Sequence, residues 1–252
     1  NYTIAYANAT LKVVNKLVSE IKFDTAIEKT YGDEDFTLTA STTSDGDITY
    51  TSSDENVVKV DSATGVVTIV GAGNAVITAN VGETADYAAG SANCTVVVAK
   101  KTVTPKIEVA DCTYNGEPQE PTLVVKADGK EMTAYSAVYS DNTNAGTAEV
   151  RIELTDKNYA GTATKQFAIQ PKNLTGKAAV SKIDVQTYNG SERKPTFTVT
   201  DSDVALVEGK DHTATYANNK DAGTATITIE FKGNYTGSAT TNFEIEPADA
   251  SK

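Results

Sequence analysis

The sequence predicts an all-β chain made of tandem β-sandwich modules in an elongated arrangement. Thr, Val, Ile and Tyr recur in alternation, while helix formers show no sustained 3.6-residue spacing, which is typical of half-buried strands. Turn signals follow strand signals roughly every eight to twelve residues, as in sandwiches and barrels. Blocks of similar sequence also recur in the same order along the 252 residues.

The recurring blocks define the modules, because self-similarity at a fixed period indicates a repeat architecture. TYNGEPQEPT matches TYNGSERKPT, DNTNAGTAEVRIEL matches NNKDAGTATITIEF, and KNYAGTATKQFAIQP matches GNYTGSATTNFEIEP. We therefore expect two similar modules at 102–171 and 172–252, called the middle and third repeats below.

A more divergent copy precedes them, with TYGDEDFTLTA from Thr30, GAGNAVITANV from Gly71 and DYAAGSANCTVVVAKK from Asp86. These blocks predict a first repeat at 17–101. The opening NYTIAYANATLKVVNK aligns with the last of the three blocks, so we interpret residues 1–16 as the terminal strand remnant of a preceding repeat. Contact with a neighbouring strand is expected to order part of it.

Each repeat also contains a long strand in which apolar and polar residues alternate. Because successive side chains of a strand point to opposite faces, TAEVRIEL after Gly146 has one apolar and one polar face. The predicted core positions of this strand in the three repeats are Ala75, Ile77, Ala79 and Val81; Ala148, Val150, Ile152 and Leu154; and Ala225, Ile227, Ile229 and Phe231. Those of the last strand of each repeat are Val96 and Val98, Phe167 and Ile169, and Phe243 and Ile245.

Turn residues separate these strands. Asn115-Gly116 and Asn189-Gly190 predict tight turns, and Gly146 and Gly223 mark further turns, because glycine accepts positive φ at low cost. The short junctions between repeats each contain a proline, which predicts restricted joints rather than flexible linkers.

The segment VVKVDSATGVVTIVGAGNAVITA, residues 57–79, resembles the bacterial immunoglobulin-like group 2 domain, with its Val-x-Val-Asp strand and Gly-x-Gly turn. The middle and third repeats, with TYNG, NNKDAGTATITI and GNYTG, resemble related immunoglobulin-like repeats found in tandem in bacterial surface and secreted proteins. The resemblance implies immunoglobulin-like sandwiches at an extracellular or cell-surface location, with signal and anchor outside this segment. It implies stalk, spacer or adhesive roles, because such folds carry many functions.

The candidates for catalysis are few. The sole histidine, His212, is expected to be an exposed polar residue, and the two cysteines fall in different predicted repeats. Cys94 and Cys112 could form a disulfide only if their strands lay side by side; isolated thiols, with Cys94 buried, are the favoured alternative. Phosphate-loop and zinc-site spacings do not occur. We predict no enzyme activity and no cofactor.

Acidic turns are the candidate metal sites. Asp45 and Asp47 flank one glycine, and Asp201 and Asp203 flank one serine. Calcium takes several carboxylate and carbonyl oxygens, and neither turn supplies a complete loop pattern. Solvated acidic turns are therefore expected, and a bound metal is not.

Tyrosines offer the alternative of carbohydrate binding, because an aromatic face can stack on a sugar ring. Several of them, however, recur at equivalent positions, which favours packing within or at the end of a sandwich. The predicted structural residues are Tyr87, Tyr114, Tyr159, Tyr188, Tyr235, Gly146 and Gly223.

The net charge of −12, without a basic cluster, argues against nucleic acid as a partner. No apolar run is long enough for a membrane span. Two functions remain: a stalk or spacer whose partners are other domains of the same parent chain, or an adhesive module that binds a glycan or a host surface protein. The insertion DSDVALVEGKDH places the adhesive alternative in 172–252, because binding usually lies on loops of a rigid scaffold.

Overall fold

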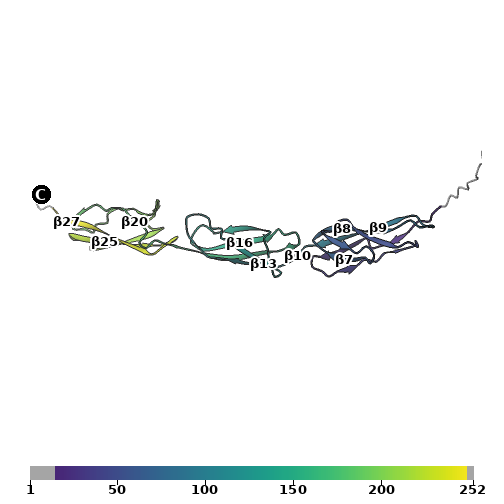
Figure 1. Ribbon diagram of the computed structural model, residues 1–252. Coiled ribbons are helices and arrows are strands. Elements are labelled where there is room, and N and C mark those ends of the chain that lie inside the picture. Colours follow the sequence, from purple (N-terminus) through teal and green to yellow (C-terminus); the bar gives the residue numbers. More distant parts are fainter. Residues whose placement is uncertain (1–14, 249–252) are drawn as a thin grey trace, which may run out of the picture. The chain divides into compact units, whose positions relative to one another are not determined.

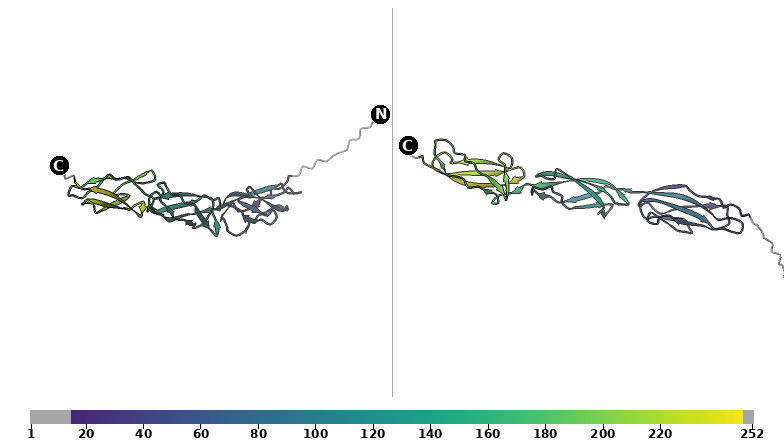
Figure 2. Two further views of the ribbon diagram at one scale, coloured as in Figure 1. Left: turned by 60° about the vertical axis from the view of Figure 1, so that its left-hand side comes forward. Right: turned by 90° about the horizontal axis from the view of Figure 1, so that it is seen from above.

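The computed structural model describes residues 15–248, and these residues form strands, turns and connecting segments without a helix. They divide into two compact units: one contains the chain up to Val103 together with Leu154–Gly161, and the other contains Thr104–Glu153 and the chain from Thr162 onward. Figures 1 and 2 show that strands, drawn as arrows, build each unit. No helix in this part of the chain could cross a membrane.

The first unit contains a four-stranded sheet in the order β2-β9-β8-β5 that faces a three-stranded sheet in the order β3-β7-β6. The strands of the larger sheet are β2 (Ala26–Thr30), β5 (Ile48–Ser52), β8 (Gly73–Val81) and β9 (Gly90–Ala99). The other strands of the unit are β1 (Ile21–Lys22), β3 (Phe36–Thr37), β4 (Ser41–Thr42), β6 (Val58–Val60), β7 (Val66–Ile69), β10 (Lys101–Thr102) and β17 (Tyr159–Ala160).

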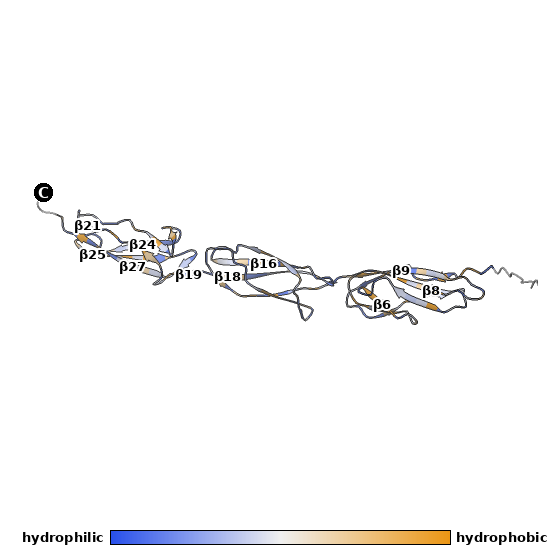
Figure 3. Cartoon of the chain, turned by 45° about the horizontal axis from the view of Figure 1, so that its top comes forward, coloured by the Kyte–Doolittle hydropathy of each residue, from blue (hydrophilic) through white to orange (hydrophobic). Residues whose placement is uncertain are grey.

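The core of the first unit lies between these two sheets. Leu38 and Val67, on the side of the smaller sheet, join Ile77 and Val96 of the larger sheet in one buried cluster. Figure 3 shows hydrophobic segments, in orange, on strands of this unit, for example beside the β6 and β8 labels. Burying such a side chain fully contributes about 1.5–3 kcal/mol relative to leaving it exposed.

The second unit begins with the strands of the middle repeat, arranged in the orders β12-β18-β16-β15 and β11-β13-β14. Their bounds are β11 (Lys106–Val109), β12 (Cys112–Thr113), β13 (Leu123–Ala127), β14 (Lys130–Glu131), β15 (Tyr135–Ser140), β16 (Gly146–Leu154) and β18 (Thr162–Gln170). β13 and β16 are labelled in Figure 1.

The strands of the third repeat follow the same plan, in the orders β21-β27-β25-β24 and β20-β22-β23, with the pair β19-β26 beside them. Val199 and Leu206 of the smaller sheet share one core cluster with Ile227 and Phe243 of the larger sheet. The bounds are β19 (Lys172–Asn173), β20 (Ala179–Val180), β21 (Gln186–Thr187), β22 (Val199–Asp201), β23 (Val204–Leu206), β24 (His212–Ala217), β25 (Gly223–Phe231), β26 (Tyr235–Thr236) and β27 (Ser238–Glu246).

The predicted register of the long strands is confirmed. All the core positions predicted in β8, β16 and β25, and in β9, β18 and β27, are buried. The glycines that open the long strands pair in the same register in all repeats, Gly73 with Val98, Gly146 with Ile169 and Gly223 with Ile245. The all-β tandem sandwich predicted from alternation is therefore the observed fold.

The two Asn-Gly turns form as predicted, and the asparagine and the glycine have different roles in them. Gly116 and Gly190 have φ of 93° and 82°. The Asn115 Oδ1 atom accepts a hydrogen bond from the Glu117 N–H at 2.9 Å, and the Asn189 Oδ1 atom accepts one from the Ser191 N–H at 3.0 Å. Each asparagine thus stabilises the turn through its side chain, while the glycine supplies the positive φ.

The remnant predicted at the start of the chain falls almost wholly outside the described residues, which begin at Asn15.

Candidate functional site

One end of every repeat has a tyrosine directly after a strand, held by the same backbone hydrogen bond. The N–H groups of Tyr31, Tyr114 and Tyr188, called the strand-end tyrosines, donate to the carbonyls of Ala99, Gln170 and Glu246 at 2.8, 2.9 and 2.8 Å. The strand that precedes each tyrosine, β2, β12 or β21, runs parallel to the last strand of its repeat. The repeated sequence TYxx therefore forms a repeated structural position.

The Asn-Tyr segments, 158–160 and 234–236, lie beside the strand that begins the same repeat. β17 pairs in parallel with β10, and β26 pairs in parallel with β19. The Lys101 and Lys172 N–H groups each donate to the carbonyl of the segment's asparagine at 2.9 Å. In the first repeat an isolated parallel bridge joins Leu17 to Tyr87, the equivalent tyrosine.

Two strand-end tyrosines meet tyrosines of Asn-Tyr segments edge to face. In the first unit the ring centroids of Tyr31 and Tyr159 are 5.4 Å apart at an interplanar angle of 83°. In the second unit those of Tyr114 and Tyr235 are 5.5 Å apart at 84°. Both geometries lie in the preferred range for aromatic pairs.

The environment of Tyr235 opposes its ionisation. The side chain is only 6% exposed. Burial, followed by the neighbouring Tyr114 hydroxyl and its hydrogen bond and then by Asp201 and Asp211, raises the pKa of Tyr235 to about 12. This tyrosine is therefore a packing residue that stays neutral across the physiological range.

The asparagines of the Asn-Tyr segments bind a turn of the preceding repeat. The Ala72 N–H donates to Asn158 Oδ1 at 2.8 Å within the first unit, and the Ala145 N–H donates to Asn234 Oδ1 at 2.8 Å within the second. Asn234 Nδ2 also donates to Asn144 Oδ1 at 2.9 Å. The acceptor side chain thus satisfies a backbone donor that lies at the tip of a turn.

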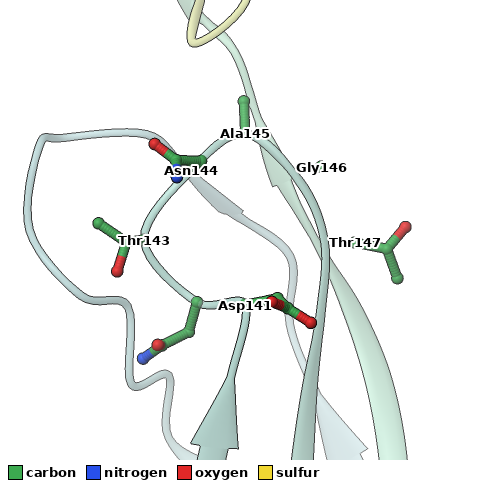
Figure 4. Close-up of a pocket in the computed structure, with 7 residues that line it drawn as sticks. Asp141, Thr143, Asn144, Ala145, Gly146 and Thr147 are labelled. Carbon is green, nitrogen blue, oxygen red and sulfur yellow. The ribbon is translucent and has the colours of Figure 1, made fainter.

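These turns, 71–73 and 144–146 with their counterpart 221–223, are called the Ala-Gly turns. Figure 4 shows the second of them, with the Ala145 side chain pointing out from its tip and Asn144 beside it. Gly73, Gly146 and Gly223 adopt φ of 145°, 145° and 133°, a conformation that disfavours other residues.

The residue at position 71 explains why the contact of Asn158 with its turn differs from that of Asn234. A Cβ atom on Gly71 would lie 2.6 Å from the Asn56 carbonyl oxygen and 3.2 Å from Asn158 Oδ1, so a side chain like that of Asn144 does not fit there. Instead, Lys157 Nζ donates to the Asn56 carbonyl at 3.2 Å, and Lys100 Nζ donates to the Asp156 carbonyl at 2.7 Å.

The structure places the residues predicted as structural at these contacts. Tyr159 and Tyr235 are buried, Tyr114 is half-buried against Tyr235, and Gly146 opens β16 after an Ala-Gly turn. Tyr87, Tyr188 and Gly223 occupy the equivalent positions at the remaining ends. Every tyrosine within residues 15–248 is buried or half-buried.

The acidic turns serve other roles. Asp45, Asp47 and Asp203 are exposed, whereas Asp201 is half-buried and pairs with Lys172 Nζ at 2.5 Å. The Ser202-Asp203 pair is the two-residue turn between β22 and β23. Across residues 15–248, no three His, Cys, Asp or Glu side chains gather as metal ligands would.

His212 corrects an expectation. It was predicted to be exposed, but it is only 4% exposed. His212 begins β24, opposite Phe231, and the alternation of that strand turns its ring inward, 6.5 Å from the Phe197 ring. The pairing of β24 with β25 buries the His212 side chain, and the polar residues next to it in the sequence gave no sign of this.

Both cysteines are free, and the predicted burial of Cys94 in β9 is confirmed. Cys112 in β12 is half-buried. Burial, with Asp24 near Cys94 and Asp111 near Cys112 as further causes, raises the pKa of both thiols.

Sequence reasoning missed the asparagines that precede the tyrosines. The sequence shows Asn158 and Asn234 as part of a repeated Asn-Tyr pair, but the groups that hydrogen-bond to their side chains belong to the preceding repeat. The recurrence of Ala-Gly in GAG, NAG and DAG was the matching signal.

A family model described as MBG domain matches residues 106–173 and 178–249, which together make up more than half of the chain. Similar solved structures include the I-band fragment I67-I69 from titin, at 12% identity, covering 92% of this chain and 99% of that chain, with a TM-score of 0.37. Drosophila N-cadherin EC1-4 is 11% identical and covers 92% of this chain and 76% of that chain, with a TM-score of 0.30.

Bacteroides ovatus mixed-linkage glucan utilization locus SGBP-B, solved in complex with a mixed-linkage heptasaccharide, is 15% identical and covers 91% of this chain and 70% of that chain, with a TM-score of 0.27. A comparison with curated proteins gave no match.

Proposed function

Since the chain belongs to the MBG domain family, we propose that it is a non-catalytic spacer of tandem immunoglobulin-like repeats in a bacterial cell-surface or secreted protein. Its partners are then other domains of the same parent chain, which it holds apart. The repeats are those at 17–101, 102–171 and 172–252, with a remnant at 1–16.

The observation that carries this proposal is the repeated contact between an Asn-Tyr segment and the end of the preceding repeat. An edge-to-face tyrosine pair and an asparagine side chain bound to an Ala-Gly turn occur together twice. A spacer transmits position only if its joints resist bending, and a hydrogen bond combined with a packed ring pair restricts both tilt and twist.

The test measures motion at the joint between the middle and third repeats. Backbone ¹⁵N relaxation of the full chain should give the same rotational correlation time for residues 104–153 and for residues 178–246. Asn234→Ala removes two hydrogen bonds and should shorten the correlation time of the third repeat relative to the middle one. The matched control is Asn242→Ala, an exposed asparagine on β27. Independent tumbling already in the unaltered chain would overturn the proposal.

An adhesive role is the alternative, and one observation favours it. Val204 and Val207, in and beside β23 of the insertion, are 59% and 55% exposed. Such side chains can contact a host protein or the apolar face of a glycan. Saturable binding to an array of glycans and extracellular-matrix proteins, lost in Val204→Ser/Val207→Ser but kept in Val138→Ser, would favour this role over a spacer alone.

A further inference from the structure

The end of the third repeat that contains Tyr188 has the same construction as the two ends that bind Asn-Tyr segments. Tyr188 is held by the Glu246 carbonyl as Tyr114 is held by that of Gln170. Gly223 pairs with Ile245 as Gly146 pairs with Ile169. The backbone at this end is therefore already arranged for the contact described above.

A pair of hydrogen bonds also holds the segment that leads into the turn. The Arg193 N–H donates to the Asn219 carbonyl at 2.6 Å, and Asn219 Nδ2 donates to the Arg193 carbonyl at 2.9 Å. Gln119 and Asn142 make the same pair of bonds in the middle repeat, at 2.7 and 2.9 Å. A surface that is ordered before binding loses less entropy when a partner arrives.

The three ends differ in what covers them. Ala72 is buried at 8% exposure and Ala145 is half-buried, whereas Ala222 is exposed. Within residues 15–248, the Ala222 N–H has no acceptor, and Tyr188 has no edge-to-face tyrosine partner like those of Tyr31 and Tyr114. Within the described residues, the third end thus has a backbone donor at Ala222 without an acceptor and a half-buried Tyr188 in the place of Tyr114.

We propose that Tyr188 and the Ala-Gly turn 221–223 form a docking surface for the Asn-Tyr segment of a further repeat of this family. This inference rests on the proposed spacer function. The asparagine Oδ1 atom would accept from the Ala222 N–H, its Nδ2 atom would donate to the Asp221 carboxylate, and the tyrosine would meet Tyr188 edge to face.

Charge decides which segment fits. Asp221 stands where the middle repeat has Asn144, and a carboxylate accepts a hydrogen bond from an amide more strongly than a neutral oxygen does. The first repeat of a second copy would offer Asp86 and Tyr87, which would place two carboxylates together and repel. The surface therefore selects an Asn-Tyr segment over the Asp-Tyr segment of the first repeat.

The experiment extends the full chain by a second copy of residues 171–248, joined after Glu246. The third repeat has its own core cluster, so the added copy can fold beside it. Amide hydrogen exchange at Ala222, measured by NMR, should slow by about tenfold on extension, as expected for one added hydrogen bond with packing. Ala145 in the same molecule is the internal reference.

Variants of the appended copy separate the contributions. Asn234→Ala in that copy alone should return Ala222 to fast exchange. Asn234→Asp in that copy should also leave Ala222 of the original repeat in fast exchange. Adding Asp221→Asn in the original repeat should restore the protection of Ala222 in that variant.

Fast exchange at Ala222 in the extended chain, with Ala145 protected, would overturn this inference and leave the spacer function standing. Fast exchange at Ala145 itself would instead count against the joint on which that function rests. Protection of Ala222 that rises with the concentration of the unextended chain would show that a second copy docks there, which would overturn the choice of occupant.

Discussion

Tyr114 and Tyr235 meet edge to face with their ring centroids 5.5 Å apart, although they belong to different repeats. The Tyr31 and Tyr159 rings reproduce this geometry within 0.1 Å and 1°. The two pairs lie in unlike sequence surroundings and still adopt one arrangement. The backbone hydrogen bonds of Tyr31 and Tyr114, and those that the asparagines before Tyr159 and Tyr235 accept, are the same in both.

The Tyr114 and Tyr235 rings should be energetically coupled. Urea denaturation of Tyr114→Ala, Tyr235→Ala and the double variant should give a coupling free energy of about 0.5–1.5 kcal/mol, the range for aromatic pairs. The matched cycle uses Tyr135→Ala with Tyr235→Ala. Additive effects of the first pair would show that the contact contributes nothing to stability.

Alkaline pH should weaken the second unit through Tyr235. Its pKa rises from 10.0 to about 12 on folding, so the unfolded chain releases this proton first. The stabilising contribution is complete below pH 10 and is lost as the pH rises toward about 12.

Urea unfolding at a series of pH values checks this prediction. Tyr235→Phe should show a smaller loss of unfolding free energy across that window than the unaltered chain, whereas Tyr188→Phe should lose as much. An equal loss in both variants would mean that Tyr235 does not carry the effect.

Two glycines with nearly the same φ should respond differently to substitution by alanine. Gly65 and Gly176 have φ of 70° and 69°. A Cβ atom on Gly65 would lie 2.3 Å from the Leu38 carbonyl oxygen, whereas one on Gly176 would meet nothing within 4 Å.

Gly176→Ala should therefore cost only the left-handed strain, about 1–2 kcal/mol. Gly65→Ala should cost more, because the Leu38 backbone must also move. Thermal unfolding followed by circular dichroism compares the two variants, and a smaller effect for Gly65→Ala would contradict the steric argument.

The two faces of β25 should differ sharply in tolerance. Ile227 is fully buried, and Ile227→Ala should destabilise the third repeat by about 2–5 kcal/mol through lost burial and a cavity. Thr228→Ala, one residue along and on the opposite face, is the control and should change the unfolding free energy by less than about 1 kcal/mol. Similar losses for both would show that the strand is not packed in the described register.

Alternation along the strands was enough to predict the fold and its core. Ile152, Ile227 and Phe243 could be placed inward from sequence because the side-chain period of a strand is two, so one apolar face identifies every position on it. Recurrence of TYNG and NYxG further predicted that the tyrosines had structural positions.

Tertiary structure alone decided what those positions contact. Asn234 Oδ1 accepts a hydrogen bond from the Ala145 N–H, which belongs to another repeat. The local sequence around either residue does not indicate that the two will meet. His212 is buried for the same reason: the pairing of β24 with β25 places it opposite Phe231, and Phe197, which lies outside the strands, packs 6.5 Å from its ring. Local periodicity determines which face of a strand is apolar, whereas the partner of a polar side chain depends on packing between segments that are distant in the chain.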